Sequence, residues 1–302
     1  MVLSRRQFIS ASALAVAAPA VLRSRAFASV LQGPVTRFEG LQGGVGYFIG
    51  NGGTIGWLLN GDGALAIDSQ YPATAQVCVD GLRGRSPKGV RLLINTHHHA
   101  DHVAGNPRFR PYVETIVQQE RCAKLHRDTT VKTAASQAYA DLTFGGSWST
   151  TFGNEKVWAK YYGPGHTGGD AIVIFEKANV VHMGDLMFNR MHPFIDRPNG
   201  ASIQNWVKAL GTIAGEYKDA TFIFGHAKPG MPVVGSNADL LHFRDYLSAV
   251  LDQARKGIAA KQTKAQITAL PSLPGFEEYS GAPPRLTLAS SLGVAYDELM
   301  GK

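Results

Sequence analysis

Cysteine is scarce in this sequence, because Cys78 and Cys122 are the only two in 302 residues. Their separation fits no C-x-x-C spacing, which argues against a metal centre built on cysteine, and two residues cannot form a disulfide scaffold. An oxidising compartment would permit a single bridge between them. We favour instead two free, buried thiols.

A long apolar run is also missing. The longest, near residues 8–22, contains serine and proline and is shorter than the ~20 apolar residues of a permanent membrane helix. Arg5 and Arg6 precede it and the small-x-small site 26–28 follows it, which is the layout of a cleaved export signal. The arginine pair resembles the twin-arginine signal, whose route exports folded proteins; an ordinary secretory signal is the alternative. We therefore predict that residues 1–28 are removed and that the mature chain is periplasmic, with no stable membrane anchor.

The charge is modest once this signal is set aside. The whole chain has a formal net charge of +7, but residues 1–28 hold four arginines and no acidic residue, so the rest carries +3. No basic stripe interleaved with aromatic residues, as a nucleic-acid groove requires, is present in the sequence. We expect no nucleic-acid partner.

Residues 29–302 show no internal repeat and are long enough for one large core, so we predict a single domain. Apolar runs typical of strands alternate with segments of helical periodicity. The expected strands are residues 55–60, 64–68, 90–96, 112–118, 157–162, 171–176, 180–183 and 221–224. The expected helices are 203–217, 239–260 with Asn237 as the N-cap, and 286–300, whereas 133–151 and 271–284 are less patterned. This order predicts a mixed α/β fold in which helices cover sheets.

The densest group of reactive side chains lies in NTHHHADHVAGN, directly after an expected strand. Because alternate side chains of an extended chain share a face, we expect His97 and His99 to point to one place and His98 to point away. Asp101 and His102, about one turn later, can reach a second point nearby. An affinity tag would lie at a terminus and lack the carboxylate, so the arrangement indicates a metal centre with two sub-sites.

Three more residues of ligand type follow strands or lie in a glycine-rich turn. His166 is in GPGHTGGD, Asp185 follows the apolar run VVHMG, and His226 follows TFIFG. Imidazole and carboxylate groups are the ligands that zinc binds in such sites. A lone histidine is more often structural than a ligand, and we assign the structural role to His126, His182 and His242.

Taken in order, the motifs T-H-x-H-x-D-H, G-x-x-H-T-x-G-D, G-D and G-H resemble those of the metallo-beta-lactamase fold superfamily, over nearly all of the mature chain. The resemblance implies a four-layer αβ/βα sandwich with a binuclear centre, usually of zinc, at one edge. It implies that one ion is held by His97, His99 and His166. It implies that the other is held by Asp101, His102 and His226, with Asp185 bridging the two. Asp68 matches an early aspartate of the family that contacts the ligands from behind.

The implied chemistry is hydrolysis of a C(=O)–X bond in a small-molecule substrate. Two metal ions about 3.5–4 Å apart lower the pKa of a shared water to about 7 and polarise the attacked oxygen. Our hypothesis is that the metal-bridging hydroxide, oriented by Asp101, attacks an ester, thioester, lactone or beta-lactam. Iron or manganese instead of two Zn²⁺, with redox chemistry in the case of iron, is an alternative. A non-catalytic metal-binding accessory protein is another.

Asp185 bears on the substrate. The resemblance implies that dedicated beta-lactamases have a cysteine at this place or lack the bridging aspartate, so Asp185 favours the wider hydrolase branches. A thioesterase like hydroxyacylglutathione hydrolase, a lactonase and a beta-lactamase proper stay open as alternatives. The loop 187–202 is expected to form part of the pocket wall through Asn189, Arg190 and His192. Lys228 is either a partner for a substrate carboxylate or a solvated lysine.

Overall fold

The computed structural model describes residues 35–130 and 136–302, and the predicted export signal at 1–28 lies outside the described residues. Residues Thr36–Lys302 form one unit. Within the described part of the chain, no helix combines the length and the apolar character needed to cross a membrane.

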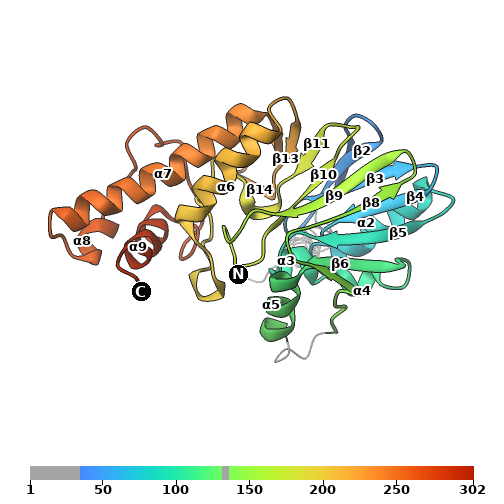
Figure 1. Cartoon of the computed structure of the whole chain (residues 1–302), viewed down its shortest axis with the longest axis horizontal. Helices are drawn as coiled ribbons and strands as arrows, with labels where there is room; N and C mark the ends of the chain where they lie inside the picture. Colours follow the sequence, from blue (N-terminus) through green and yellow to red (C-terminus); the bar gives the residue numbers. More distant parts are fainter. Residues whose placement is uncertain (1–34, 131–135) are drawn as a thin grey trace, which may run out of the picture. The chain divides into compact units, whose positions relative to one another are not determined.

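The first sheet has seven strands, in the order β1-β2-β3-β4-β5-β6-β7. Figure 1 labels the strands β2 to β6 of this sheet. They are β1 (Arg37–Gly40), β2 (Val45–Ile49), β3 (Ile55–Asn60), β4 (Gly63–Ile67), β5 (Val90–Asn95), β6 (Thr115–Gln119) and β7 (Leu142–Phe144). Strands β1 to β4 pair antiparallel, and β4 to β7 pair in parallel. The strands β3 and β4, which match the expected strands 55–60 and 64–68, form a hairpin in which Asn60 pairs with Gly63 across a two-residue turn.

The second sheet has six strands, in the order β15-β13-β11-β10-β9-β8. They are β8 (Ser147–Phe152), β9 (Glu155–Tyr161), β10 (Ala171–Phe175), β11 (Val180–His182), β13 (Thr221–Ile223) and β15 (Val234–Gly235). Only β11 and β13 are parallel neighbours in this sheet. A separate parallel pair joins β12 (Phe188–Asn189) to β14 (His226–Ala227).

The helices are α2 (Pro72–Arg85), α3 (Ala100–Val103), α4 (Asn106–Phe109), α5 (Glu120–Thr130), α6 (Ile203–Glu216), α7 (Asn237–Ala259), α8 (Lys264–Thr268) and α9 (Leu288–Leu299). Two 3-10 turns, η1 (Gly184–Leu186) and η2 (Arg197–Asn199), lie between β11 and α6. The expected N-cap of α7 was wrong by one residue. Ser236 occupies the cap, because its backbone N–H donates to Asp239 Oδ2 at 3.0 Å in a capping box.

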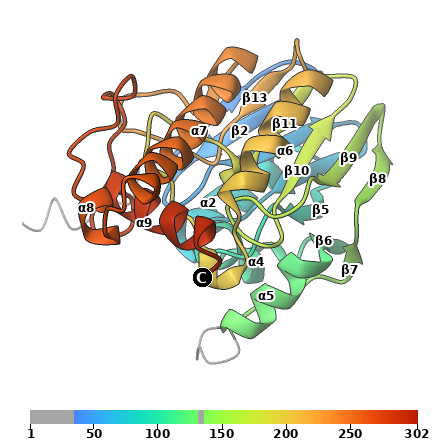
Figure 2. The ribbon, with the colours of Figure 1, turned by 60° about the vertical axis from the view of Figure 1, so that its left-hand side comes forward.

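Alternating side chains of the strands divide the interior into separate buried clusters. On β10, Ile172 and Ile174 face the helices α6 and α7, whereas Val173 and Phe175 face the first sheet. On the far side of the first sheet, α2 packs against the opposite face of β4 and β5. Figure 2 shows α6 and α7 lying side by side over the second sheet. The order helix, sheet, sheet, helix is the predicted four-layer αβ/βα sandwich.

Both cysteines are free and buried, as we favoured, with Cys78 on α2 and Cys122 on α5.

Candidate metal centre

Strand ends bring the predicted ligands together at one edge. Asp68 directly follows β4 and His97 comes two residues after β5, and these strands are parallel neighbours. Asp185 and His226 follow β11 and β13, which are also parallel neighbours. His166 lies in the turn before β10, whose first residues lie beside the end of β11 because the two strands are antiparallel.

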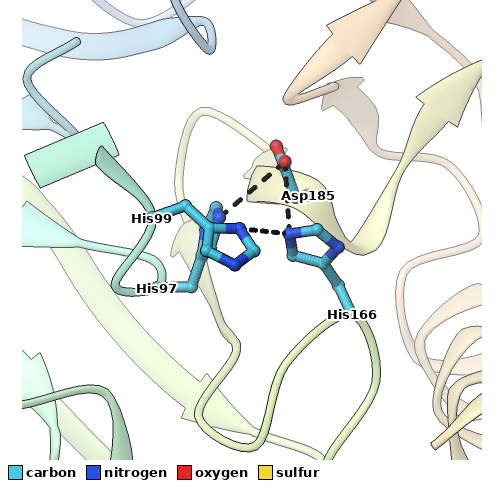
Figure 3. Close-up of side chains that lie close together, drawn as sticks. All are labelled: His97, His99, His166 and Asp185. Carbon is cyan, nitrogen blue, oxygen red and sulfur yellow. Dashed lines mark hydrogen bonds and ion pairs between the residues drawn. The ribbon is translucent and has the colours of Figure 1, made fainter. Parts of the chain in front are cut away.

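The first group consists of His97, His99, His166 and Asp185, whose ligand atoms all lie within 4.8 Å of one another. Figure 3 shows the three imidazoles and the carboxylate pointing toward one another. His166 Nε2 lies 2.8 Å from His99 Nδ1 and 3.4 Å from Asp185 Oδ2. His97 Nε2 lies 3.8 Å from the same oxygen. Four nitrogen and oxygen atoms therefore surround one point.

The second group consists of Asp101, His102 and His226, again with ligand atoms within 4.8 Å of one another. His226 Nε2 lies 3.1 Å from Asp101 Oδ2, and His102 Nε2 lies 3.7 Å from that oxygen. Asp185 also reaches this group, at 3.1 Å from His102 Nε2 and 3.3 Å from His226 Nε2. The structure thus brings together all seven residues that the sequence singled out, with Asp185 between two groups.

Asp68 lies behind the second group. Its Oδ2 is 2.7 Å from His102 Nδ1, and its two oxygens accept hydrogen bonds from the backbone N–H and the hydroxyl of Thr96, each at 2.8 Å. Its backbone has a φ of 64°, in the left-handed region that non-glycine residues rarely adopt. Held in this way, Asp68 leaves Nε2 of His102 to face Asp101 and Asp185, which fits the role implied for it.

Asp196 does the same for the first group, and nothing in its residue type or spacing had marked it. Its Oδ2 lies 2.8 Å from His99 Nε2, which leaves Nδ1 of His99 to face His166. His98 Nε2 is 3.7 Å from the same carboxylate. His98 therefore lies outside the two groups around Asp185, as the alternation of side chains predicted. The one available signal for Asp196 was its place in the loop 187–202.

The three histidines that we expected to be structural also lie outside these two groups. His182 Nε2 is 3.0 Å from the carbonyl oxygen of Thr54, His126 contacts two glutamine side chains, and His242 contacts Glu278.

The electrostatics of the centre suit a cation. Burial lowers the pKa of His97, and lowers that of His166 to about 3, so both imidazoles are neutral and able to ligate at neutral pH. At His226, burial is outweighed by the carboxylates of Asp185 and Asp101, which raise its pKa to about 10. At His102, burial is likewise outweighed by nearby carboxylates, chiefly that of Asp185, which raise the pKa well above its usual value. Buried carboxylates here require positive charge, which protons or metal ions can supply.

One buried, unpaired nitrogen atom indicates that a metal ion fits this site. Among the described residues, His97 Nε2 finds no hydrogen-bond partner, although its side chain is only 1% exposed. Buried polar atoms are normally paired, so a lone pair aimed into a group of histidines and a carboxylate is the expected arrangement around a metal ion. Five imidazoles and two carboxylates form a donor set that zinc and similar transition metals accept.

A cavity of about 380 Å³ opens over this centre. Its floor includes ligand-type side chains of both groups, among them Asp101, Asp185 and His226. Its wall is largely apolar and comes from separate parts of the chain: Tyr71, Phe188, Met191, Phe194 and Leu286. Such a concave, mostly apolar site with a few convergent polar groups is typical of small-molecule binding.

The residues expected in the pocket wall lie elsewhere. Asn189 is buried and donates through Nδ2 to the carbonyl oxygen of Pro232 at 2.9 Å. Arg190 Nε lies 3.6 Å from a carboxylate oxygen of Glu278. Phe188 and Met191, on either side of these two residues in the sequence, line the cavity instead.

His192 and Lys228 are likewise occupied away from the cavity. His192 Nδ1 is 2.8 Å from the hydroxyl of Tyr246, and Lys228 Nζ donates to the carbonyl oxygen of Glu278 at 2.8 Å. Both partners belong to the C-terminal third of the chain. The local sequence pattern of the loop does not predict these contacts.

The fold consists of two sheets flanked by helices, and two adjacent groups of histidine and aspartate side chains lie under an open cavity. This combination is typical of a class of metal-dependent hydrolases. Residues 50–226 match the family model described as the metallo-beta-lactamase superfamily, and this chain belongs to that superfamily. The match includes all seven ligand-type residues and ends before α7, α8 and α9.

Known relatives agree with this placement. Metallo-beta-lactamase type 2 of Bacillus cereus is 25% identical over 189 residues, which is 61% of this chain and 69% of that protein. The solved metallo-beta-lactamase from Pontibacter korlensis is similar with a TM-score of 0.60 at 17% identity, over 71% of this chain and 99% of that one. A double mutant of the sec-alkyl sulfatase PisA1 reaches a TM-score of 0.69 at 15% identity, over 88% of this chain and 50% of that one. These structures are similar to this chain in fold.

Proposed function

We propose that this protein is a zinc-dependent hydrolase that cleaves a C(=O)–X bond in a small-molecule ester, thioester, lactone or beta-lactam. One observation carries the proposal: Asp185 lies between two groups of histidine and aspartate side chains on the floor of an open cavity. A closed structural metal site would not need such an opening.

Two Zn²⁺ ions would be held by His97, His99 and His166 and by Asp101, His102 and His226, with Asp185 shared. When bound, they would supply an acidified water and a Lewis acid that polarises the carbonyl oxygen of the substrate. The chain itself orients two of the ligands. Asp68 contacts Nδ1 of His102 and leaves Nε2 for a metal, and Asp196 contacts Nε2 of His99 and leaves Nδ1 for a metal.

Asp101 would bind and orient the attacking water molecule. Its side chain is 24% exposed and lines the cavity, next to His226 at 3.1 Å. Burial tends to raise its pKa, but His102 and His226 outweigh burial and lower the pKa to about 2. The carboxylate is therefore ionised at neutral pH, where it can accept a hydrogen bond from a water molecule and orient it.

The apolar wall has a different task. Tyr71, Phe188 and Phe194 can pack against the acyl part of a substrate and exclude bulk water from the reacting bond. The relative from Bacillus cereus is named a beta-lactamase, which favours beta-lactams as a second candidate, whereas Asp185 favours the other acyl substrates.

A small substrate panel tests the proposal. We would measure hydrolysis of nitrocefin, an acyl-homoserine lactone, a thioester and p-nitrophenyl esters, and add a secondary alkyl sulfate because PisA1 is similar over much of the chain. Turnover of any carbonyl substrate that a chelator stops and zinc restores supports the proposal. Protein that holds two zinc ions and hydrolyses none of them contradicts it and favours the accessory role.

We also propose that the protein is exported to the periplasm. The support is the arrangement of Arg5, Arg6 and the small-x-small site 26–28. Mass spectrometry of protein from a periplasmic fraction should give a chain that begins at Ser29. Replacing both arginines with lysine should keep the chain in the cytoplasm if the route is the twin-arginine one. Full-length chain confined to the cytoplasm in the unaltered protein would overturn the proposal.

A further inference from the structure

Arg285 supplies a cation to the cavity wall. Apart from histidines of the metal centre, it is the one basic residue among the described residues that line the cavity. The acidic residues of the lining are Asp101 and Asp185, and both belong to the metal centre. Arg285 also lies well beyond residue 226, where the match to the family model ends.

The guanidinium group of Arg285 is available for a ligand. Its carbon Cζ lies 5.2 Å from the ring centroid of Phe194, and Phe194 is itself part of the wall. We find no hydrogen bond or ion pair of the Arg285 side chain within residues 35–130 and 136–302. Arg190 and Lys228, in contrast, are both bound to Glu278. The cation that a substrate can reach is therefore Arg285.

The segment that carries Arg285 is held on both sides. Before it, the ring of Tyr279 stacks on Tyr246 with centroids 4.0 Å apart, and Ser280 accepts a hydrogen bond from the backbone of His192 at 3.0 Å. After it, the side chain of Thr287 caps the first turn of α9 by accepting from Ser290 N. Arg285 thus extends from a short stretch between two fixed points.

We propose that Arg285 determines substrate specificity by binding a carboxylate group of the substrate. The planar guanidinium matches the two oxygens of a carboxylate, and the Phe194 ring holds it from one side. Met191 and Leu286 line the same cavity and would contact the apolar part between the carboxylate and the reacting carbonyl. The substrate class is therefore a small acyl compound with an apolar body and a carboxylate end. This inference rests on the proposed hydrolase function.

The test uses two aryl esters that differ only at the far end, one ending in a carboxylate and one in a carboxamide. In Arg285→Ala, kcat/KM for the carboxylate ester should fall roughly tenfold, because a charged hydrogen bond at a partly exposed site is lost. The value for the carboxamide ester should stay within about twofold. Arg285→Lys should recover part of the loss, since it keeps the charge without the planar fork.

Arg255→Ala is the matched control. Arg255 is exposed on α7 and pairs with Asp252, so its loss should leave both esters unchanged. Metal content is measured in every variant. Equal loss for both esters in Arg285→Ala would show a structural role and overturn the inference. An equal loss for a sulfonate-ended ester would replace a carboxylate site with a general anion site and overturn the assignment to carboxylates.

A binding measurement separates this inference from the proposed function. If the unaltered protein hydrolyses neither these two esters nor any carbonyl substrate of the panel above, the hydrolase proposal fails, and calorimetry with the carboxylate-ended amide analogue still tests Arg285. Binding that is about tenfold tighter to the unaltered protein than to Arg285→Ala supports the carboxylate site. Equal binding to the two proteins overturns it.

Discussion

Asp196 controls which nitrogen His99 offers to a metal. Its carboxylate is bound to Nε2, so Nδ1 faces the first group. Replacing Asp196 with Ala should lower zinc affinity by about 10- to 100-fold, because the imidazole loses both its orientation and a charged acceptor. Competition with a chromophoric zinc chelator measures this affinity without any substrate.

The control for that experiment is Asp245→Ala. Asp245 is an exposed carboxylate of α7 whose partner is Arg244, so zinc affinity should not change. Unchanged affinity in Asp196→Ala as well would show that Asp196 does not orient a ligand.

Asp101 is the residue whose loss should affect turnover most. Asp101→Asn keeps the size of the side chain but removes the negative charge that orients water, so we expect kcat to fall by about 10²- to 10⁴-fold. Circular dichroism should show an unchanged fold, because the side chain lines a cavity and is not part of the core. Full activity in this variant would remove Asp101 from the mechanism.

Residue type explains what could be predicted at the site. Histidine and aspartate directly after apolar strands indicate a metal site, so His97 and Asp185 could be found from the sequence. Phe194 and Arg285 could not, because an apolar or a single basic side chain has many ordinary roles. The polar residues of the loop were chosen wrongly for the same reason: His192 looked like a pocket residue, but its partner Tyr246 is 54 residues away in the chain.

At the scale of elements, the turn between β2 and β3 must lie close to the metal centre. A Cβ atom added at Gly53 would collide with the imidazole ring of His102, whereas one added at Gly61 would meet no atom within 4 Å. Gly53→Ala should therefore displace His102, lower zinc affinity and destabilise the fold by about 1–3 kcal/mol. Chelator competition and chemical denaturation measure the two effects.

Gly61→Ala, in the turn between β3 and β4, is the matched substitution. It should leave zinc affinity unchanged, because its surroundings are open. If both alanine variants bind zinc like the unaltered protein, the close packing of the β2–β3 turn on His102 has no role in the site.

The buried strands were predictable, whereas an edge strand and the helix α2 were not. The strands β5 and β10 are almost wholly buried and appear in the sequence as short apolar runs. The strand β8 lies at the edge of its sheet with mostly exposed or half-buried polar side chains, so the segment 133–151 was less patterned in the sequence. The helix α2 escaped notice because part of its buried face consists of the small side chains of Thr74, Ala75 and Cys78.

At the scale of the whole described unit, the metal centre joins the two sheets. His97, His99, Asp101 and His102 follow β5 of the first sheet, whereas Asp185 and His226 follow β11 and β13 of the second sheet and His166 lies in the turn before β10. Each group of ligands contains residues of both sheets. Metal binding should therefore stabilise the contact between the layers as well as the local loops.

Metal removal tests this expectation. A ligand that binds only the folded state at about 1,000 times its Kd adds about 4 kcal/mol of stability. For a domain of this size, that corresponds to a fall of roughly 10 °C in Tm when a chelator removes the metal. Elemental analysis should first show close to two zinc ions per chain. Calorimetry with and without chelator should then show this shift in Tm.

Readdition of zinc is the control and should restore Tm. One iron per chain would contradict the zinc assignment. An unchanged Tm after complete metal removal would show that the ions do not stabilise the contact between the two sheets and act only in the chemistry of the cavity.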